Sequence, residues 1–192
     1  KKLALKLNDN QSLAWAEYSI ISGDLAKGKT DSVIQKIENN ISFNNIKKTD
    51  TALYYKIQLL KANALNRIND RTAALDLQLK LLNEAEKEGN INAQLFALNF
   101  IGATYLNVNK PAAAKQTWLQ GLQIIREKNS AENNEIAAYI LSNLALYYFN
   151  NYYINQTKEL NDSFLTAINK TIELSNQNEN LGVLASAISI RG

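Results

Sequence analysis

Apolar residues recur at helical spacing along most of this chain, and short polar breaks rich in Asn or Gly separate the periodic stretches. The clearest example is the stretch 95–126, which breaks at Asn107–Lys110 and resumes at Pro111. Each half places small and bulky apolar residues on one helical face: Leu95, Leu98, Ile101, Gly102 and Tyr105, then Ala114, Trp118, Gly121, Leu122 and Ile125. Pro111 suits the first turn of a helix, because its missing N–H would have no partner there. This stretch therefore predicts two antiparallel helices joined by a short turn.

The same pattern predicts further helical hairpins on both sides. We expect hairpins at about 12–39, 50–89, 91–128 and 131–176, with partial repeats at 1–8 and 180–192. Asp50 or Thr49 is expected to cap the helix that starts at Thr51, and Gly89 stands where a C′ glycine belongs. A small residue lies within each first helix, at Gly23, Ala62, Gly102, Ala145 and Gly192, with spacings of 39, 40, 43 and 47 residues. One Pro, seven Gly and a helical period together favour an all-α chain.

The central stretch resembles a tetratricopeptide repeat (TPR). That pattern has a small residue, a Tyr, an Ala, an aromatic and a second small residue, filled here by Gly102, Tyr105, Ala114, Trp118 and Gly121. The resemblance implies one domain over 1–192, an α-solenoid of antiparallel hairpins stacked as a right-handed superhelix. The repeats are longer than the standard one of about 34 residues. A globular helical bundle stays open as the alternative, because periodicity alone does not fix how hairpins stack.

The resemblance also implies a binding surface. In TPR proteins the first helices line a concave groove, and carrying that over selects Lys56, Leu59, Asn63, Asn66, Arg67, Phe96, Asn99, Leu106, Tyr139, Ser142, Phe149 and Asn150. Amide side chains can hydrogen-bond an extended peptide in both senses, and aromatic side chains can anchor it. The alternative is that these aromatics pack on adjacent helices. Of the carboxylate-clamp residues of chaperone-binding TPR proteins, only Asn63 matches, so an acidic C-terminal peptide is not the expected ligand.

Catalytic chemistry has little to build on in this composition. The chain has no His and no Cys, which removes the commonest general base and the thiolate metal ligands. Ser19, Ser22 and Lys27 are ordinary helix-surface residues, and the acids at Glu84, Glu86 and Glu88 spread around a helix instead of converging. No Gly-rich phosphate loop or calcium-loop pattern occurs. We therefore expect a protein that is not an enzyme and that has no cofactor and no metal site.

Charge and hydropathy narrow the expected partners. The net charge is +3, but the basic residues are scattered among acids, so we expect no nucleic-acid binding by this segment. No apolar run approaches the roughly 18 residues of a membrane span, and no signal-peptide pattern opens the chain. The chain lacks an initiator Met, so we expect a piece of a longer protein.

An aromatic cluster, Tyr147–Tyr153, is expected to form a long turn between helices at about 131–150 and 156–174. Such a turn is either a recognition patch or a cover for the hairpin core. Tyr148 is expected to be a packing residue of the hairpin.

The expected function is a non-enzymatic module that binds a protein or peptide segment on the concave face of its first helices. The alternative is a ligand-sensing input domain of a bacterial regulator, joined to a histidine kinase or helix-turn-helix output domain outside this chain. A third class is self-association through exposed solenoid ends. A scaffold would be cytoplasmic, whereas a membrane-sensor input domain could be periplasmic.

Overall fold

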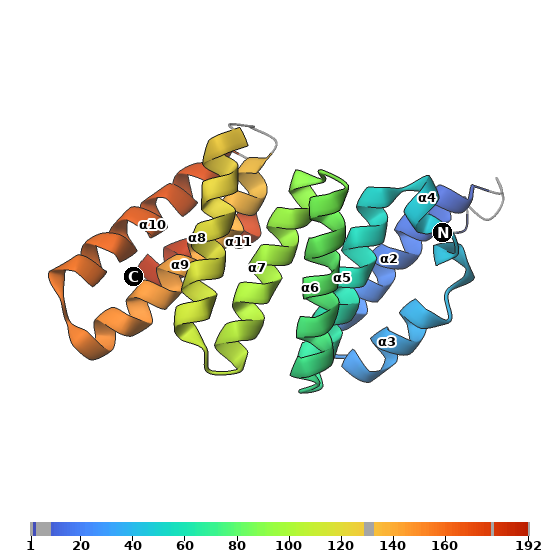
Figure 1. The fold of residues 1–192 in the computed structure, drawn as a ribbon, viewed down its shortest axis with the longest axis horizontal. Coiled ribbons are helices and arrows are strands. Elements are labelled where there is room, and N and C mark those ends of the chain that lie inside the picture. Colours follow the sequence, from blue (N-terminus) through green and yellow to red (C-terminus); the bar gives the residue numbers. More distant parts are fainter. Residues whose placement is uncertain (1, 3–8, 129–132, 178, 192) are drawn as a thin grey trace. The chain divides into compact units, whose positions relative to one another are not determined.

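The computed structural model describes residues 2, 9–128, 133–177 and 179–191, and all its regular elements in these ranges are helices (Figure 1). Within these ranges, ten α-helices and one short 3₁₀ helix follow one another, and helices adjacent in sequence pack together. This confirms the all-α prediction. The chain divides into two compact units, Lys1–Glu84 and Ala85–Gly192, which we call unit 1 and unit 2. The predicted single solenoid over 1–192 stays a prediction.

Unit 1 is built from helices of unequal length, several of which pack around an apolar cluster. Its elements are α2 (Asn10–Ala26), α3 (Thr30–Glu38), η1 (Ile41–Phe43), α4 (Ile46–Thr49), α5 (Thr51–Arg67) and α6 (Arg71–Lys87), the last of which continues into unit 2. The cluster contains Ala14, Ile21, Leu25, Val33, Ile37, Ile46, Leu53, Ile57, Leu60 and Ala64. Because η1 and α4 interrupt the connection between α3 and α5, the expected loop around Phe43 is itself partly helical.

Asp50 joins two helices of unit 1. Its carboxylate accepts a hydrogen bond of 2.9 Å from the backbone N–H of Leu53 and so caps α5, as the sequence predicted. The same carboxylate accepts bonds from Trp15 Nε1 at 2.8 Å and Gln11 Nε2 at 3.1 Å, both in α2. Burial raises the pKa of Asp50, but these hydrogen bonds outweigh burial, and the pKa lies below its ordinary value. The charged side chain therefore orients α2 on the start of α5.

The predicted register of the first helix is wrong. Gly23 was expected on the packed face of this helix, and the helical period would then bury Ile20, three residues before it, on the same face. Instead Ile20 is 48% exposed, and a Cβ added at Gly23 would meet nothing within 4 Å. Apolar residues occur on several sides of this helix, and the bond from Trp15 to Asp50 selects a rotation that buries Ala14, Ile21 and Leu25. Of the other predicted small positions, Ala62, Gly102 and Ala145 are buried, whereas Gly192 lies outside the described residues.

Unit 2 contains two complete hairpins followed by a further helix. Its elements are α7 (Ile91–Asn107), α8 (Pro111–Lys128), α9 (Asn134–Asn155), α10 (Lys158–Gln177) and α11 (Leu181–Arg191). As predicted, α8 starts at Pro111. The predicted partial repeat at 180–192 is helical in α11, while that at 1–8 lies almost wholly outside the described residues.

The hairpin of α7 and α8 is locked by a glycine beneath a tryptophan. A Cβ added at Gly102 would lie 2.8 Å from Cδ1 of Trp118 and closer still to Nε1, so only glycine allows this approach. The Trp118 side chain is fully buried, and its indole N–H donates a hydrogen bond of 3.2 Å to the carbonyl of Asn99. Ala114 and Gly121 are buried on the same face of α8, which confirms the predicted packing of this hairpin.

The hairpin of α9 and α10 also has a small residue and an aromatic residue in one core cluster. Ala145 and Phe164 belong to this cluster together with Ala167, Ile168 and, from α11, Ala187. α11 then packs against both α9 and α10.

The expected aromatic turn at Tyr147–Tyr153 does not exist. These residues lie within α9, which continues to Asn155 and ends at Gln156 in the left-handed conformation, with φ of 50°. The two-asparagine break was the misleading signal: the Asn151 amide donates to the carbonyl of Tyr147 at 2.8 Å, inside the helix. Tyr147 and Tyr148 pack against the core, as expected for Tyr148, whereas Tyr153 is 78% exposed; a recognition role for the cluster stays a prediction.

Five helices end in the same way. A residue with positive φ follows the helix, and the next N–H donates to the carbonyl five residues before it, which is the Schellman motif. The positive-φ residues are Gly28, Asn69, Gly89, Asn109 and Glu179. The C′ role predicted for Gly89 is therefore confirmed, and the Asn-rich breaks in the sequence are mostly these turns.

Candidate functional site

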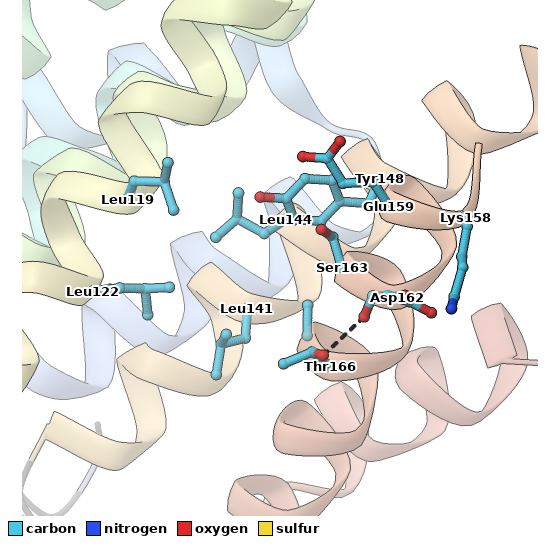
Figure 2. Close-up of a pocket in the computed structure, with 11 residues that line it drawn as sticks. Leu119, Leu122, Leu141, Leu144, Tyr148, Lys158, Glu159, Asp162, Ser163 and Thr166 are labelled. Atoms are coloured by element: carbon cyan, nitrogen blue, oxygen red, sulfur yellow. Dashed lines mark hydrogen bonds between the residues drawn. The ribbon is translucent and has the colours of Figure 1, made fainter. Parts of the chain in front are cut away.

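A groove lies between α8 and α10 on the surface of unit 2, with α9 beneath it (Figure 2). It encloses about 630 Å³ and is open to solvent. We call it the α8–α10 groove; its lining residues are Leu119, Leu122, Leu141, Leu144, Tyr148, Lys158, Glu159, Asp162, Ser163, Thr166 and Ala167. Its volume falls in the range of ligand pockets in general, although such pockets are usually more enclosed.

The floor of the groove is made of leucines from two helices. α8 and α10 each pack against α9. Trp118 and Gly121 form the buried face of α8, so Leu119 and Leu122 stand at the edge of that face, next to Leu141 and Leu144 of α9 (Figure 2). Leu119 is 37% exposed, whereas Leu144 is 2% exposed. The accessible apolar surface of the groove is therefore provided by Leu119, together with half-buried Leu122 and Leu141.

The α10 side of the groove is polar. Glu159, Asp162 and Ser163 follow the start of α10 at Lys158, and Figure 2 shows Glu159 and Ser163 beside Tyr148, next to the leucines. The hydroxyl of Thr166 donates a bond of 2.8 Å to the backbone carbonyl of Asp162, so it is occupied within the helix. Glu159 and Asp162 form no ion pair with another residue in the described ranges.

Tyr148 closes one end of the groove. Burial, and after it the neighbouring Tyr147, raises the pKa of the Tyr148 phenol above its ordinary value. The hydroxyl is thus neutral at physiological pH and can donate or accept a hydrogen bond. Lys115 of α8 holds its ammonium 5.4 Å from the centre of the Tyr148 ring, a cation–π contact that braces α8 against α9.

This arrangement is suited to holding apolar side chains from another molecule. The two carboxylates of the groove stand on exposed turns of one helix, without a nucleophile and base in hydrogen-bond contact. Within the described part of the chain, no three acidic side chains are placed to hold a metal ion, and no helix is both long and apolar enough to cross a membrane.

Five of the residues predicted to line a concave surface belong to unit 1. Leu59 is only 4% exposed and offers little surface. Arg67 donates a hydrogen bond of 2.6 Å to the carbonyl of Leu25, where it satisfies the end of α2. Lys56, Asn63 and Asn66 are half-buried on α5.

The other seven predicted residues lie in unit 2, and several serve contacts between helices. Asn99 is buried and accepts a bond of 2.9 Å from the amide of Asn143, and the Tyr139 hydroxyl accepts one of 3.3 Å from Asn180. Phe149 packs its ring against Phe164 with centroids 5.6 Å apart. The remaining members are Phe96 and Leu106, which pack on a core cluster, half-buried Ser142 and exposed Asn150. Ligand binding by these twelve residues stays a prediction.

Sequence reasoning missed the groove because its residues come from both hairpins. Leu122, Leu141, Leu144 and Tyr148 were interpreted as packing residues. Leu119, Glu159, Asp162 and Ser163 were not singled out. One signal was present: Leu119 is an apolar residue among the exposed Gln116, Gln120 and Gln123, outside the predicted packing face.

No protein-family model matches this chain, and no curated protein shows significant similarity to it. The resemblance to TPR proteins therefore depends on the residues at the helix crossings.

Proposed function

We propose that this chain is a non-enzymatic interaction module of the TPR-like kind, which binds a protein or peptide segment in the α8–α10 groove. The observation that carries the proposal is an open channel whose floor consists of leucines and whose rim is polar. The TPR-like packing within unit 2 is supported by Gly102 beneath Trp118 in one hairpin and by Ala145 in one core cluster with Phe164 in the next.

The expected interaction is of modest strength. Burying a leucine side chain completely contributes about 1.5–3 kcal/mol, and the groove leucines are already partly covered by their neighbours. Association also has an entropic cost that a small contact offsets only in part. We therefore expect dissociation constants in the micromolar range, near 8 kcal/mol of binding free energy or less.

A selection from a random peptide library displayed on phage, with the intact chain as bait, tests the proposal. Leu119→Gln should abolish binding of the selected peptides, because it places an amide in the apolar floor. The matched control is Leu165→Gln, since Leu165 of α10 is 38% exposed and does not line the groove. Peptides that lose affinity equally with both variants would contradict the proposal.

The same peptides decide between the groove and the surface predicted from the TPR resemblance. Phe96→Ala combined with Tyr139→Ala should leave their affinity within about twofold, after correction for any loss of folded protein. Loss of binding in this double variant, with Leu119→Gln still active, would move the site to the first helices.

A further inference from the structure

We infer that the α8–α10 groove takes an amphipathic helix from a partner protein, with an apolar stripe facing the leucines and basic side chains facing α10. This inference depends on the proposed function and names the class of segment bound. Three features of the groove carry it: the form of its floor, the backbone chemistry of its walls, and the unequal charge of its two sides.

The floor presents two short apolar rows at helical spacing. Leu119 and Leu122 are three residues apart on α8, and Leu141 and Leu144 are three apart on α9, where Leu144 is only 2% exposed and Leu141 is half-buried. Rows of this kind leave the shallow furrows into which the side-chain ridges of another helix pack. A ligand helix with apolar residues at i, i+3, i+4 and i+7 would place its stripe against both rows.

The walls of the groove favour a helix over an extended peptide. An extended segment leaves its backbone N–H and C=O groups to be paired, and in most strand-binding proteins the edge of a sheet pairs them. All regular elements in the described part of unit 2 are helices, and helices have already paired most of their own backbone groups. The polar side chains next to the leucines are few, namely Tyr148, Glu159 and Ser163 (Figure 2). A helical ligand satisfies its own backbone and needs none of them.

Charge complementarity selects a basic flank. On the α8 side, Gln116 and Gln120 are neutral, the ammonium of Lys115 lies over the Tyr148 ring, and Arg126 follows Leu122 by four residues. On the α10 side, Figure 2 shows Glu159 beside Tyr148, next to the leucines. Lys158 and Asp162 are four residues apart on α10, and Figure 2 shows the Asp162 side chain on the same side as Lys158, away from the leucines. The charge of α10 nearest the leucines is therefore the carboxylate of Glu159.

Two designed peptides of about 15 residues, near the shortest length that is helical in water, test the inference. Both carry the same leucine stripe, and one has Lys on the flank where the other has Gln. With the intact chain, fluorescence anisotropy should show the Lys peptide binding at least about threefold more tightly, because each exposed ion pair contributes only modestly. The preference should shrink in high salt, because screening weakens exposed charge pairs.

Variants of the chain locate the preference. Glu159→Gln should remove the advantage of the Lys peptide and leave the affinity of the Gln peptide unchanged, whereas Asp162→Asn, on the side of α10 away from the leucines, should leave the advantage in place. Leu119→Gln should weaken both peptides at least about tenfold, whereas Leu165→Gln should weaken neither. Circular dichroism of the bound peptides should show increased helix content.

The outcomes separate this inference from the proposed function. Equal binding of the two peptides to the wild-type chain would overturn the basic flank and leave the proposed function standing. Failure of both peptides, together with an empty phage selection, would overturn both. Sedimentation showing a dimer of this chain that Leu119→Gln disperses would assign the groove to a second copy and refute a partner helix.

Discussion

The two units of this chain hold their helices together by different means. In unit 2 the decisive contact is one of shape, because Trp118 lies over Gly102 where no Cβ fits. In unit 1 a Cβ added at the corresponding glycine, Gly23, would meet nothing within 4 Å, and hydrogen bonds of carboxylates join the helices there. Asp50 joins α2 to α5, and Glu84 of α6 accepts bonds from Lys47 of α4 at 2.7 Å and Tyr54 of α5 at 3.2 Å.

This difference teaches that one sequence pattern can be met by two kinds of contact. A shape contact tolerates changes of pH but not of volume, since a packed interior has no room to relax. A contact through ionised carboxylates tolerates changes of volume nearby but depends on the charge being kept. The two units should therefore respond to opposite perturbations.

The largest expected effect is that of Gly102→Leu, which should destabilise unit 2 by more than about 4 kcal/mol, because it overpacks the crossing with Trp118. Gly23→Leu is the matched control, and it should change stability by less than about 1 kcal/mol, since the added side chain meets open space. Urea unfolding measures each effect. For Gly102→Leu it is followed by Trp118 fluorescence in a Trp15→Phe background. For Gly23→Leu it is followed by Trp15 fluorescence in a Trp118→Phe background. Similar losses at both sites would contradict the comparison.

A smaller change at the same crossing tests how strictly the space above residue 102 limits the size of its side chain. Gly102→Ala should cost about 1–3 kcal/mol. In the Trp118→Phe background the same substitution should cost at least about 1 kcal/mol less, because the smaller ring leaves room for the methyl group that the indole would meet. Unfolding followed by far-ultraviolet circular dichroism completes this double-mutant cycle. Strict additivity of the two substitutions would show that they do not share a contact.

Acid should act first on unit 1. Burial raises the pKa of Asp50, but hydrogen bonds from Leu53, Gln11 and Trp15 outweigh burial, so this pKa lies below its ordinary value. The hydrogen bond from Lys47 likewise lowers the pKa of Glu84. A carboxyl group whose pKa is lowered in the folded state contributes stability that is fully present above its unfolded-state pKa of about 4. This contribution is lost as the pH falls through the pKa of the folded state. We expect Trp15 fluorescence to report loss of structure at a higher pH than Trp118 fluorescence does.

Asp50→Ala tests the hydrogen bonds of Asp50 at neutral pH. It removes the cap of α5 and both bonds to α2, and should cost about 1–2 kcal/mol. Acid unfolding of this variant should begin less steeply than that of the wild type, because one lowered carboxylate is gone. An unchanged acid profile would show that Asp50 does not contribute to the pH dependence.

The smallest predicted effect compares two helix ends of unit 2. Glu179 has φ of 53° after α10, where Asn109 has φ of 57° after α7. Glutamate is costly in this conformation and asparagine is not, so Glu179→Gly should stabilise the chain by about 1 kcal/mol. Asn109→Gly should change stability by only a few tenths of that amount. Thermal unfolding of the two variants measures the difference, and equal effects would contradict the strain at Glu179.

Much of the fold could be predicted because its signals are local. Pro111 and Gly89 mark a helix start and a helix end through backbone chemistry that depends on adjacent residues. The spacing of Gly102, Ala114 and Trp118 was sufficient to predict the central crossing, since a helix has one period and a small residue must face a large one. The predicted break at Asn150 and Asn151 failed because helix propensity is a weak preference, and packing of the aromatic residues of α9 outweighed it.

The candidate site was harder to predict for a physical reason. The groove exists because α8 and α10 diverge above α9, and no periodicity within one helix records the distance between two others. Leu119 could be recognised as an apolar residue off the packing face, but its neighbour Glu159 comes from a different hairpin. Whether the twelve predicted first-helix residues bind a ligand is untested.

By itself the sequence determined that this chain is helical, where most of its helices begin and end, and how the central hairpin is packed. These properties follow from hydrogen bonding and side-chain size over a few turns. Only the tertiary structure decided the rotation of the first helix, the length of α9 and the presence of an open groove. Each of those depends on contacts between residues far apart in the chain, such as that of Trp15 with Asp50, whose energies no local pattern contains.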